Sequence, residues 1–253
     1  MTSEEGTGGE SETRREIAAM VRLSVPIVIT QVGLMLMGIV DTVMLGHYSA
    51  RALAAGALAN LLTYSLLVLG NGTLGALDPL VSQAFGAGDL GAIGGHLQRG
   101  LVLGAFLAIP LGLFLWNLRP ILTFLGQRPE VAIDAAAYCR ALVWGNVALF
   151  FVVAFRQTLQ AMSVVRPALV AIVIGNLVNA LGNWVLIFGH FGFPPLGVVG
   201  SAHATSAARW AMFVCILVAS RRALAKIWRG FTAEAVDLRR HLRLLRLGLP
   251  IGL

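Results

Sequence analysis

Six long apolar runs fill most of this sequence, and they constrain its fold more than any other feature. A helix needs about 20 apolar residues to cross the hydrocarbon core of a membrane, and most of the runs approach or exceed that length. None shows the alternating pattern of a strand, and an open sheet in lipid would leave backbone groups unpaired. The runs cover approximately residues 19–46, 52–84, 100–118, 138–155, 167–188 and 197–220. The sequence therefore predicts an all-α integral membrane protein with six transmembrane helices.

The composition agrees with a membrane location. Hydrophobic residues make up 57% of the chain and charged residues only 12%, whereas about a quarter of a soluble chain is charged. The net charge of +7 does not indicate a nucleic-acid partner, because the basic residues flank the apolar runs. Cys139 and Cys215 show neither a disulfide framework nor a metal-ligand spacing. We expect a multi-pass protein of the plasma (inner) membrane.

The lysine and arginine residues lie mostly on one side of the predicted helices. If the N-terminus is inside, the outer side holds only Arg51, Arg119, Arg128 and Arg140, and Arg209 falls within the sixth helix. The remaining basic residues lie on the inner side. Cytoplasmic loops of membrane proteins carry such an excess of positive charge, so the sequence predicts a cytoplasmic N-terminus.

The segments that flank the predicted six-helix lobe of residues 19–220 differ from it in composition. Residues 1–18 are predicted to be a disordered cytoplasmic tail, because the start of the chain is acidic and rich in Gly and Ser. Residues 221–245 are basic, with apolar residues at roughly helical spacing. This pattern predicts an amphipathic cytoplasmic linker on the inner membrane surface, with a plain solvated linker as the alternative.

A short internal repeat marks the last residues of the chain. The hexapeptide Arg22–Ile27 recurs as Arg246–Ile251, with four of six positions identical. Many transporters are built from repeated halves. We therefore expect residues 246–253 to begin a seventh helix, and the chain to be half of a longer protein that is truncated there.

Asp41 is the only acidic residue in the first apolar run. A carboxylate inside a membrane helix costs roughly 2.5–3.5 kcal/mol, so it needs a partner, a proton or an ion. Two interpretations stay open: an ion-coupling residue, or an aspartate at a helix end that headgroup water hydrates.

Three amides follow one face of the fifth run. Asn176, Asn179 and Asn183 are spaced by three and four residues, which places them on the same side of a helix. Amides are poor lipid-facing residues, so this face should point into the bundle. There it either surrounds a ligand or only joins helices through hydrogen bonds.

The rise of a helix places several of these polar residues at a similar depth. At about 1.5 Å per residue, Asp41 lies roughly 27 Å from the inner edge, and Asn179 and Asn183 lie roughly 18 and 24 Å from it. Thr205 lies roughly 12 Å below the outer edge on a helix of opposite direction. A carboxylate, two amides and a hydroxyl at one depth predict an oxygen-lined cation site, for example for Na⁺. Alternatively, Asp41 takes up a proton, because burial favours the neutral carboxyl group.

Arg209 is a second unusual charge, about midway along the sixth run. It can snorkel, line a water-filled cavity or pair with an acid, and we favour a structural role over the cavity role. The glycine-rich stretch Gly86–Gly95 is not a phosphate loop, because no strand precedes it and no Lys-Ser or Lys-Thr follows it. The histidines show no metal-ligand spacing, and no nucleophile has a matching base. We therefore expect no enzyme and no cofactor apart from a coupling ion.

Four segments of the chain resemble MATE (multidrug and toxic compound extrusion) transporters, in the order in which that family has them. The resemblance covers residues 15–253. The similar residues are Pro26, Gln31 and Asp41–Gly46 in the first helix, Ala76–Asp89 in the second, Asn179–Asn183 and Ile187–Gly189 in the fifth, and Gly197–Ala202 with Ala204–Thr205 in the sixth.

The resemblance implies a secondary transporter of twelve helices in two lobes, in which this chain is the N-terminal lobe and a C-terminal lobe is its partner. It implies an antiporter that exports small amphipathic, often cationic organic compounds, such as drugs and toxins, in exchange for Na⁺ or H⁺. Asn183 stands where some relatives have an acid, and Asp78 where a small residue is common. By the resemblance, ion coupling falls to Asp41, Asn179, Asn183 and Thr205. We expect a cavity or structural role for three further polar residues, Gln31, Asn176 and Arg209.

Other functions are less consistent with the sequence. A lipid-linked oligosaccharide flippase of a related fold would need several cationic residues in its cavity, and only Arg209 lies at depth. A chain that truly ends at residue 253 would be a non-transporting fragment. An intramembrane enzyme would need a second acid or a histidine at the depth of Asp41, and the sequence has neither there.

Overall fold

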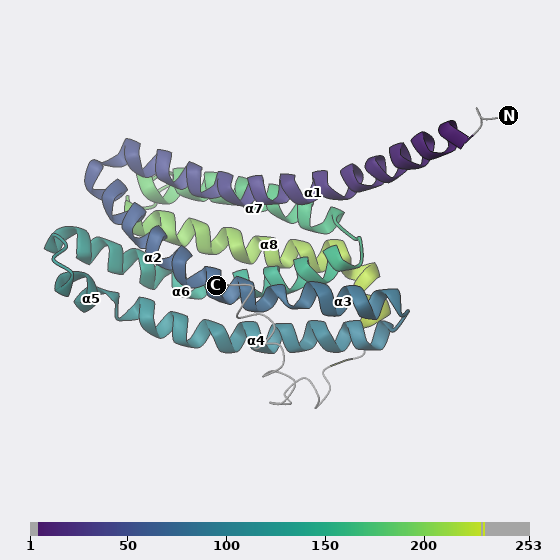
Figure 1. The fold of residues 1–253 in the computed structure, drawn as a ribbon. Coiled ribbons are helices and arrows are strands. Elements are labelled where there is room, and N and C mark those ends of the chain that lie inside the picture. The colour runs from purple at the N-terminus through teal and green to yellow at the C-terminus, as the bar shows by residue number, and fades with distance from the viewer. Residues whose placement is uncertain (1–4, 229, 231–253) are drawn as a thin grey trace.

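Long helices that lie side by side form nearly all of the computed structural model (Figure 1). It describes the backbone of residues 5–228 and 230, and the side chains from residue 24 onward apart from residues 26 and 27. The helices are α1 (Glu5–Tyr48), α2 (Ala50–Gly75), α3 (Leu77–Gly86), α4 (Leu90–Trp116), α5 (Leu118–Phe124), α6 (Pro129–Ala161), α7 (Arg166–Phe188) and α8 (Val198–Ile227). No strand occurs in this part of the chain.

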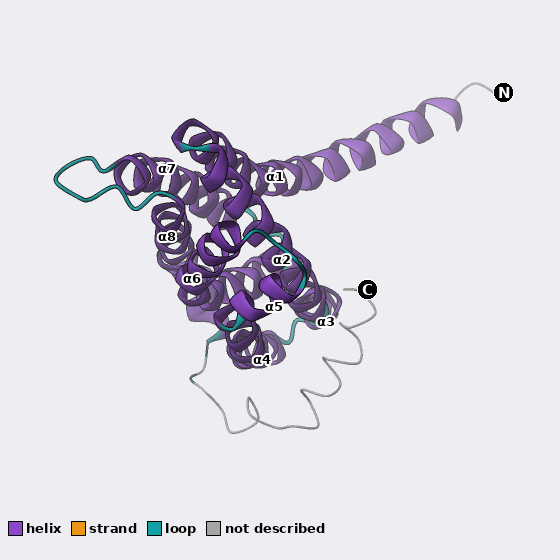
Figure 2. Ribbon diagram, turned by 90° about the vertical axis from the view of Figure 1, so that its left-hand side faces the viewer, coloured by secondary structure: helices purple, strands orange, loops and turns teal. Residues whose placement is uncertain are grey.

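Five candidate membrane spans confirm the predicted all-α membrane class. They are long and apolar enough to cross a bilayer, and they cover Val28–Tyr48, Ala50–Gly86, Leu90–Trp116, Pro129–Ala161 and Arg166–Phe188. The sixth long helix, α8, is not among these five. It lies between α7 and α6, as the end-on view of Figure 2 shows, and makes the two most extensive helix contacts of the bundle with them.

The second predicted run is interrupted, as its glycines and proline indicate. The break lies at Ala76, where α2 ends and α3 begins. Pro79 is the third residue of α3, within the first turn, where its missing N–H removes no helical hydrogen bond. Gly70 has a packing role instead, because a Cβ at this position would lie 2.5 Å from Phe150 Cε1.

Two helices extend well beyond the apolar runs that predict them. Helix α4 begins at Leu90 instead of residue 100, and α6 begins at Pro129 instead of residue 138. Asp89 explains the early start of α4, because its side chain accepts a hydrogen bond from Ala92 N at 2.9 Å as an N-cap. An apolar run therefore marks only the central part of a helix whose ends are polar.

Small residues let α8 approach its two neighbours closely. A Cβ on Gly145 of α6 would lie 2.7 Å from Ser206 Cα, and one on Gly175 of α7 would lie 2.4 Å from Met212 Cγ. Small residues at helix interfaces are typical of membrane bundles, where close packing replaces the hydrophobic effect as the driving force. This packing brings polar side chains of α7 and α8 within hydrogen-bonding distance of α1.

The flanking segments are described only in part. Helix α1 begins at Glu5, so the backbone is helical over much of residues 1–18, where a tail is predicted, and its first turns project beyond the bundle (Figures 1 and 2). Glu is the most frequent residue there and is a good helix former. Helix α8 continues to Ile227, inside the predicted linker of residues 221–245. The rest of that linker, except residues 228 and 230, and the predicted seventh helix at 246–253 lie outside the described residues.

Candidate functional site

Asp41 is the centre of a buried polar cluster formed by three helices. Asn179 Nδ2 and Asn183 Nδ2, both on α7, donate hydrogen bonds to Asp41 Oδ1 at 2.9 and 2.6 Å. Thr205 Oγ1 on α8 donates to Asp41 Oδ2 at 2.9 Å. The four side chains are at most 4% exposed, so the structure excludes the alternative of an aspartate hydrated at a helix end.

Local geometry explains why these four residues meet. Asn179 and Asn183 are one helical turn apart and therefore share the face of α7 that points into the bundle. A Cβ on Gly182 would lie 2.9 Å from Ala204 Cβ, so α7 and α8 are nearly in backbone contact beside Thr205. Asn179 Nδ2 also donates to Thr205 Oγ1 at 3.1 Å, which joins the two helices directly.

The hydrogen bonds of the cluster suit an ionised carboxylate. Asp41 accepts three hydrogen bonds, and an ionised carboxylate is an acceptor only. Buried charges of this kind are tolerated when donors surround them. Among the described residues, no basic side chain contacts Asp41, and its three hydrogen-bond donors come from neutral groups.

The oxygen atoms of the cluster determine whether a metal ion fits it. The oxygens of Asp41 and Thr205, and the Asn183 Oδ1 atom, are of the kind that hard cations take as ligands. Asn183 Oδ1 is buried and has no hydrogen-bond partner among the described residues. However, both amides present nitrogen to Asp41, so a sodium ion would require at least one amide to turn around. A proton on Asp41 requires no such oxygen shell.

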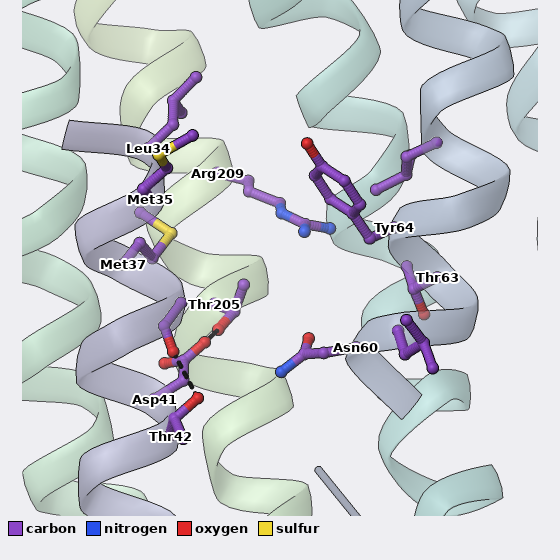
Figure 3. Close-up of a pocket in the computed structure, with 13 residues that line it drawn as sticks. Leu34, Met35, Met37, Asp41, Thr42, Asn60, Thr63, Tyr64, Thr205 and Arg209 are labelled. Atoms are coloured by element: carbon purple, nitrogen blue, oxygen red, sulfur yellow. Dashed lines mark hydrogen bonds between the residues drawn. The ribbon is translucent and has the colours of Figure 1, made fainter. Parts of the chain in front are cut away.

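Asp41 and Thr205 also line a cavity of about 400 Å³ between α1, α2 and α8. Figure 3 shows Asp41 on α1, Thr205 and Arg209 on α8, and Asn60, Thr63 and Tyr64 on α2 around this space. The rest of its wall is largely apolar, with Leu34, Met35, Met37, Leu61 and Leu67. The cavity therefore adjoins the polar cluster at Asp41 and Thr205.

Arg209 projects into the same cavity, one helical turn beyond Thr205 on α8 (Figure 3). Its guanidinium Nη1 donates a hydrogen bond to Asn146 Oδ1 on α6. Within the described part of the chain, Arg209 makes no ion pair with a carboxylate, since the ion pairs there are those of Arg51 with Glu130 and Asp134. The structure therefore places Arg209 at the cavity instead of in an acid pair.

The structure places Gln31 and Asn176 outside the Asp41 cluster. Gln31 Oε1 accepts a hydrogen bond from Arg156 Nη1 at 3.0 Å, which links α1 to α6. Asn176 Nδ2 donates to Gly33 O at 2.9 Å and to Ile172 O within its own helix. Asn176 thus joins α7 to α1 next to the cluster, in the structural role that the sequence left open.

The contrast between Asn176 and Asn179 gives a testable difference. Replacing Asn176 with Ala removes one interhelical hydrogen bond, which we expect to lower the stability of the protein by about 1 kcal/mol. Replacing Asn179 with Ala removes a donor to Asp41 and should change the dependence of transport on pH or sodium. Melting temperature and transport at several pH values distinguish the two, and an unchanged ion dependence in Asn179→Ala would contradict this assignment.

The sequence analysis does not identify three polar residues of the site. Asn146 contacts Arg209, and the buried Tyr138 donates to Asn60 Oδ1 at 3.0 Å. Asn146 is the only amide in the run of residues 138–155, and Asn60 is one of two asparagines in the run of residues 52–84; a polar side chain inside such a run is the signal that could identify them. The sequence does not show which face of α6 turns toward α8. By contrast, Asp78 is exposed in the first turn of α3, where the helix dipole favours an acid.

Comparisons with known proteins agree on one family. The MatE family model matches residues 26–185. The chain is 35% identical to the multidrug resistance protein MdtK of Klebsiella pneumoniae (strain 342) over 241 residues, which are 94% of this chain and 53% of that protein. It thus spans about half the length of the curated relatives it matches.

Solved structures share the fold. The crystal structure of the eukaryotic MATE transporter AtDTX14 superposes with a TM-score of 0.86 at 22% identity, covering 94% of this chain and 52% of that one. An outward-facing multidrug resistance MATE family transporter of the MOP superfamily gives a TM-score of 0.79 at 23% identity, covering 92% and 51%.

Proposed function

The chain belongs to the MatE family of multidrug and toxic compound extrusion transporters, and from that premise we propose that it forms one lobe of a secondary antiporter. The complete transporter would export small amphipathic organic compounds, often cationic, in exchange for H⁺ or Na⁺. Asp41 is the residue that takes up the coupling ion, with Asn179, Asn183 and Thr205 as its immediate partners. A second lobe would complete the transport path, and the greater length of the relatives, of which this chain covers about half, supports it.

The carboxylate of Asp41, only 2% exposed in a membrane-spanning helix, is the observation that carries this proposal. Such a charge is costly in a bilayer and marks ion or proton pathways in transporters. Hydrogen bonds from α7 and α8 offset part of this cost, and the adjoining cavity provides access. A carboxylate that accepts three hydrogen bonds and lines a cavity can exchange a positive charge during a transport cycle.

Neutralising Asp41 would change the contacts between three helices. Its three hydrogen bonds join α1 to α7 and α8, and charge-assisted bonds of this kind are roughly twice as strong as neutral ones. A proton or cation on Asp41 weakens them and so shifts the lobe between two packings that differ in affinity for the exported compound. The orientation of the two amides supports H⁺ more than Na⁺, because a sodium ion would require at least one to turn.

The alternative of a lipid-linked oligosaccharide flippase is not favoured. A cavity that binds a pyrophosphate would be expected to hold several cationic residues, whereas Arg209 is the single cationic residue among those that line this cavity. The family match also indicates multidrug efflux.

Transport by the protein expressed from the complete gene, reconstituted in vesicles, tests the proposal. An imposed proton gradient or an imposed sodium gradient, in otherwise identical vesicles, should drive uphill movement of a fluorescent organic cation. Movement that neither gradient drives, or that requires ATP, would overturn the antiport mechanism. A response to one gradient alone identifies the coupling ion.

A further inference from the structure

A second cavity lies at the end of the bundle that the sequence predicts to be outside. It measures about 330 Å³ and is lined by the end of α1, the start of α2, one residue of α6 and the segment that leads into α8. We call this space the outer pocket, and the space of about 400 Å³ that Asp41 lines the Asp41 cavity. The two spaces share no lining residue.

The Asp41 cluster lies between these two spaces along the helices. On α1, the residues that line the Asp41 cavity precede Asp41 or adjoin it, whereas Tyr48 lines the outer pocket. On α8, Thr205 and Arg209 line the Asp41 cavity, as Figure 3 shows, whereas Val198 lines the outer pocket. Tyr48 and Val198 are each two helical turns, or about 10 Å, from the residue of the cluster on the same helix. The outer pocket therefore approaches the cluster from the opposite side.

Ser201 occupies the level between the outer pocket and Thr205. One helical turn separates Ser201 from Thr205, so the two hydroxyl groups share one face of α8. The Ser201 side chain is 0% exposed, and its Oγ atom has no hydrogen-bond partner among the described residues. Asn183 Oδ1, in the Asp41 cluster, is buried and unpartnered in the same way. Buried polar atoms are normally hydrogen-bonded, so two such exceptions near one carboxylate indicate a ligand that passes there.

Leu45 closes the direct way between the two spaces. It follows Asp41 by one helical turn on α1 and is 1% exposed. A Cβ on Gly56 of α2 would lie 2.5 Å from Leu45 Cδ1 and 3.8 Å from Val198 Cγ2, so the Leu45 side chain fills the space between α1, α2 and the start of α8. Ser201 thus places a hydroxyl group at the level of an apolar plug.

The charges at the outer pocket favour a cation. Arg51 Nε and Nη2 donate to the Asp134 carboxylate at 2.7 and 3.0 Å, and Arg51 Nη1 lies 3.5 Å from Glu130 Oε2. One guanidinium group therefore faces two carboxylates, which leaves a net negative charge beside the pocket. A cleft that carries negative charge raises the local concentration of cations.

We propose that the outer pocket is the entrance by which the coupling ion reaches Asp41, and that Ser201 is the positioning residue on this path. A serine hydroxyl group both donates and accepts hydrogen bonds, so it can pass on a proton, and its oxygen can also bind a hard cation. Thr205 and Asn183 then connect Ser201 to the Asp41 carboxylate. The exported compound meets Asp41 from the Asp41 cavity instead. This inference rests on the proposed antiport function and gives its ion a separate entrance.

Ser201→Ala tests this path in vesicles that contain the complete protein. We expect gradient-driven transport of a fluorescent organic cation to slow by about tenfold, because an apolar layer alone does not carry a charge across. The equilibrium affinity for the organic cation should not change, since the Asp41 cluster stays intact. Ser65→Ala is the matched control, because Ser65 is exposed on α2 and lines neither space. An unmodified rate in Ser201→Ala, or a fall in rate with an equal loss of affinity, would overturn the proposal.

Silver ions measure access to this position directly. Ag⁺ is a small, soft cation that binds a cysteine thiolate, so Ser201→Cys is prepared in complete protein whose other cysteines are replaced by alanine. We expect Ag⁺ added outside intact cells to block transport in Ser201→Cys but not in the cysteine-free parent. Val199→Phe adds bulk to the wall of the outer pocket and should slow this block. Transport that external Ag⁺ does not block, or a block that Val199→Phe leaves equally fast, would overturn the proposal.

Protection by the organic cation distinguishes the two routes. A saturating concentration should protect Leu34→Cys, a position of the Asp41 cavity, from Ag⁺ but leave Ser201→Cys unprotected. Equal protection of both positions would mean that Ag⁺ arrives through the Asp41 cavity, and this would overturn the proposal. Gradient-driven transport by the unmodified protein is measured alongside. Its absence would contradict antiport itself, whereas the Ag⁺ results concern the path alone.

Discussion

Asp41→Asn is expected to reduce ion-coupled efflux to the background of passive leak. The substitution keeps the size of the side chain but removes the only acidic group of the cluster. It also turns one acceptor oxygen into an NH₂ donor, which then faces either the donors of Asn179 and Asn183 or the hydroxyl of Thr205. A buried polar group left unsatisfied in this way costs about 1–3 kcal/mol, so the local packing of α1 against α7 and α8 should change as well.

Drug accumulation in cells and gradient-driven transport in vesicles measure this effect. Asp78→Asn is the matched control, because Asp78 is an exposed aspartate on α3 outside the cluster. We expect the control to transport at nearly the unmodified rate. Asp41→Asn protein that exports at the unmodified rate, with the same dependence on pH and sodium, would contradict the assignment of ion coupling to Asp41.

Gly145→Ala is expected to destabilise the bundle by about 1–3 kcal/mol, the range for an overpacked core. A Cβ at this position would lie 2.7 Å from both Ser206 Cα and Ser206 Oγ, so α6 and α8 must separate to admit it. Ser206 Oγ also donates to Ala141 O at 2.9 Å, and a separation lengthens this interhelical bond. Because Thr205 precedes Ser206 on α8, the shift would also reach the Asp41 cluster.

The melting temperature of the purified protein in detergent measures the effect of Gly145→Ala. For a domain of 150–250 residues, each kcal/mol lowers the melting temperature by roughly 2–4 °C. Gly86→Ala is the control, since a Cβ there would meet nothing within 4 Å, and it should be neutral or slightly stabilising. Equal melting temperatures for the two variants would contradict the close approach of α6 and α8.

The sequence predicts the class and the long helices because each apolar run must satisfy its backbone groups internally in lipid. It does not predict the helix ends, since residues such as Asp89 that cap a helix lie outside the apolar run. The seven-residue helix α5 is also missed, because it is too short to show a hydrophobic period. Nearby glycines and a proline predict a break in this region of the chain, but they do not locate it at Ala76.

The Asp41 cluster is the part of the site that sequence reasoning recovers. Helical spacing places Asn179 and Asn183 on one face, and helix rise places them near the depth of Asp41 and Thr205, where the structure brings all four into contact. The partner of Arg209 was not predictable in this way. Its contact with Asn146 depends on how α6 is rotated relative to α8. That rotation depends on close packing at small residues such as Gly145, which the sequence alone does not show.

Calorimetry of substrate binding tests the role of Asp41 most directly. Binding of an organic cation to the complete protein is measured at one pH in buffers of different ionisation enthalpy, with and without sodium. We predict either a proton released on binding or competition by sodium, and the loss of that linkage in Asp41→Asn. Binding that releases no proton and ignores sodium, or that shows the same linkage in Asp41→Asn, would contradict the account.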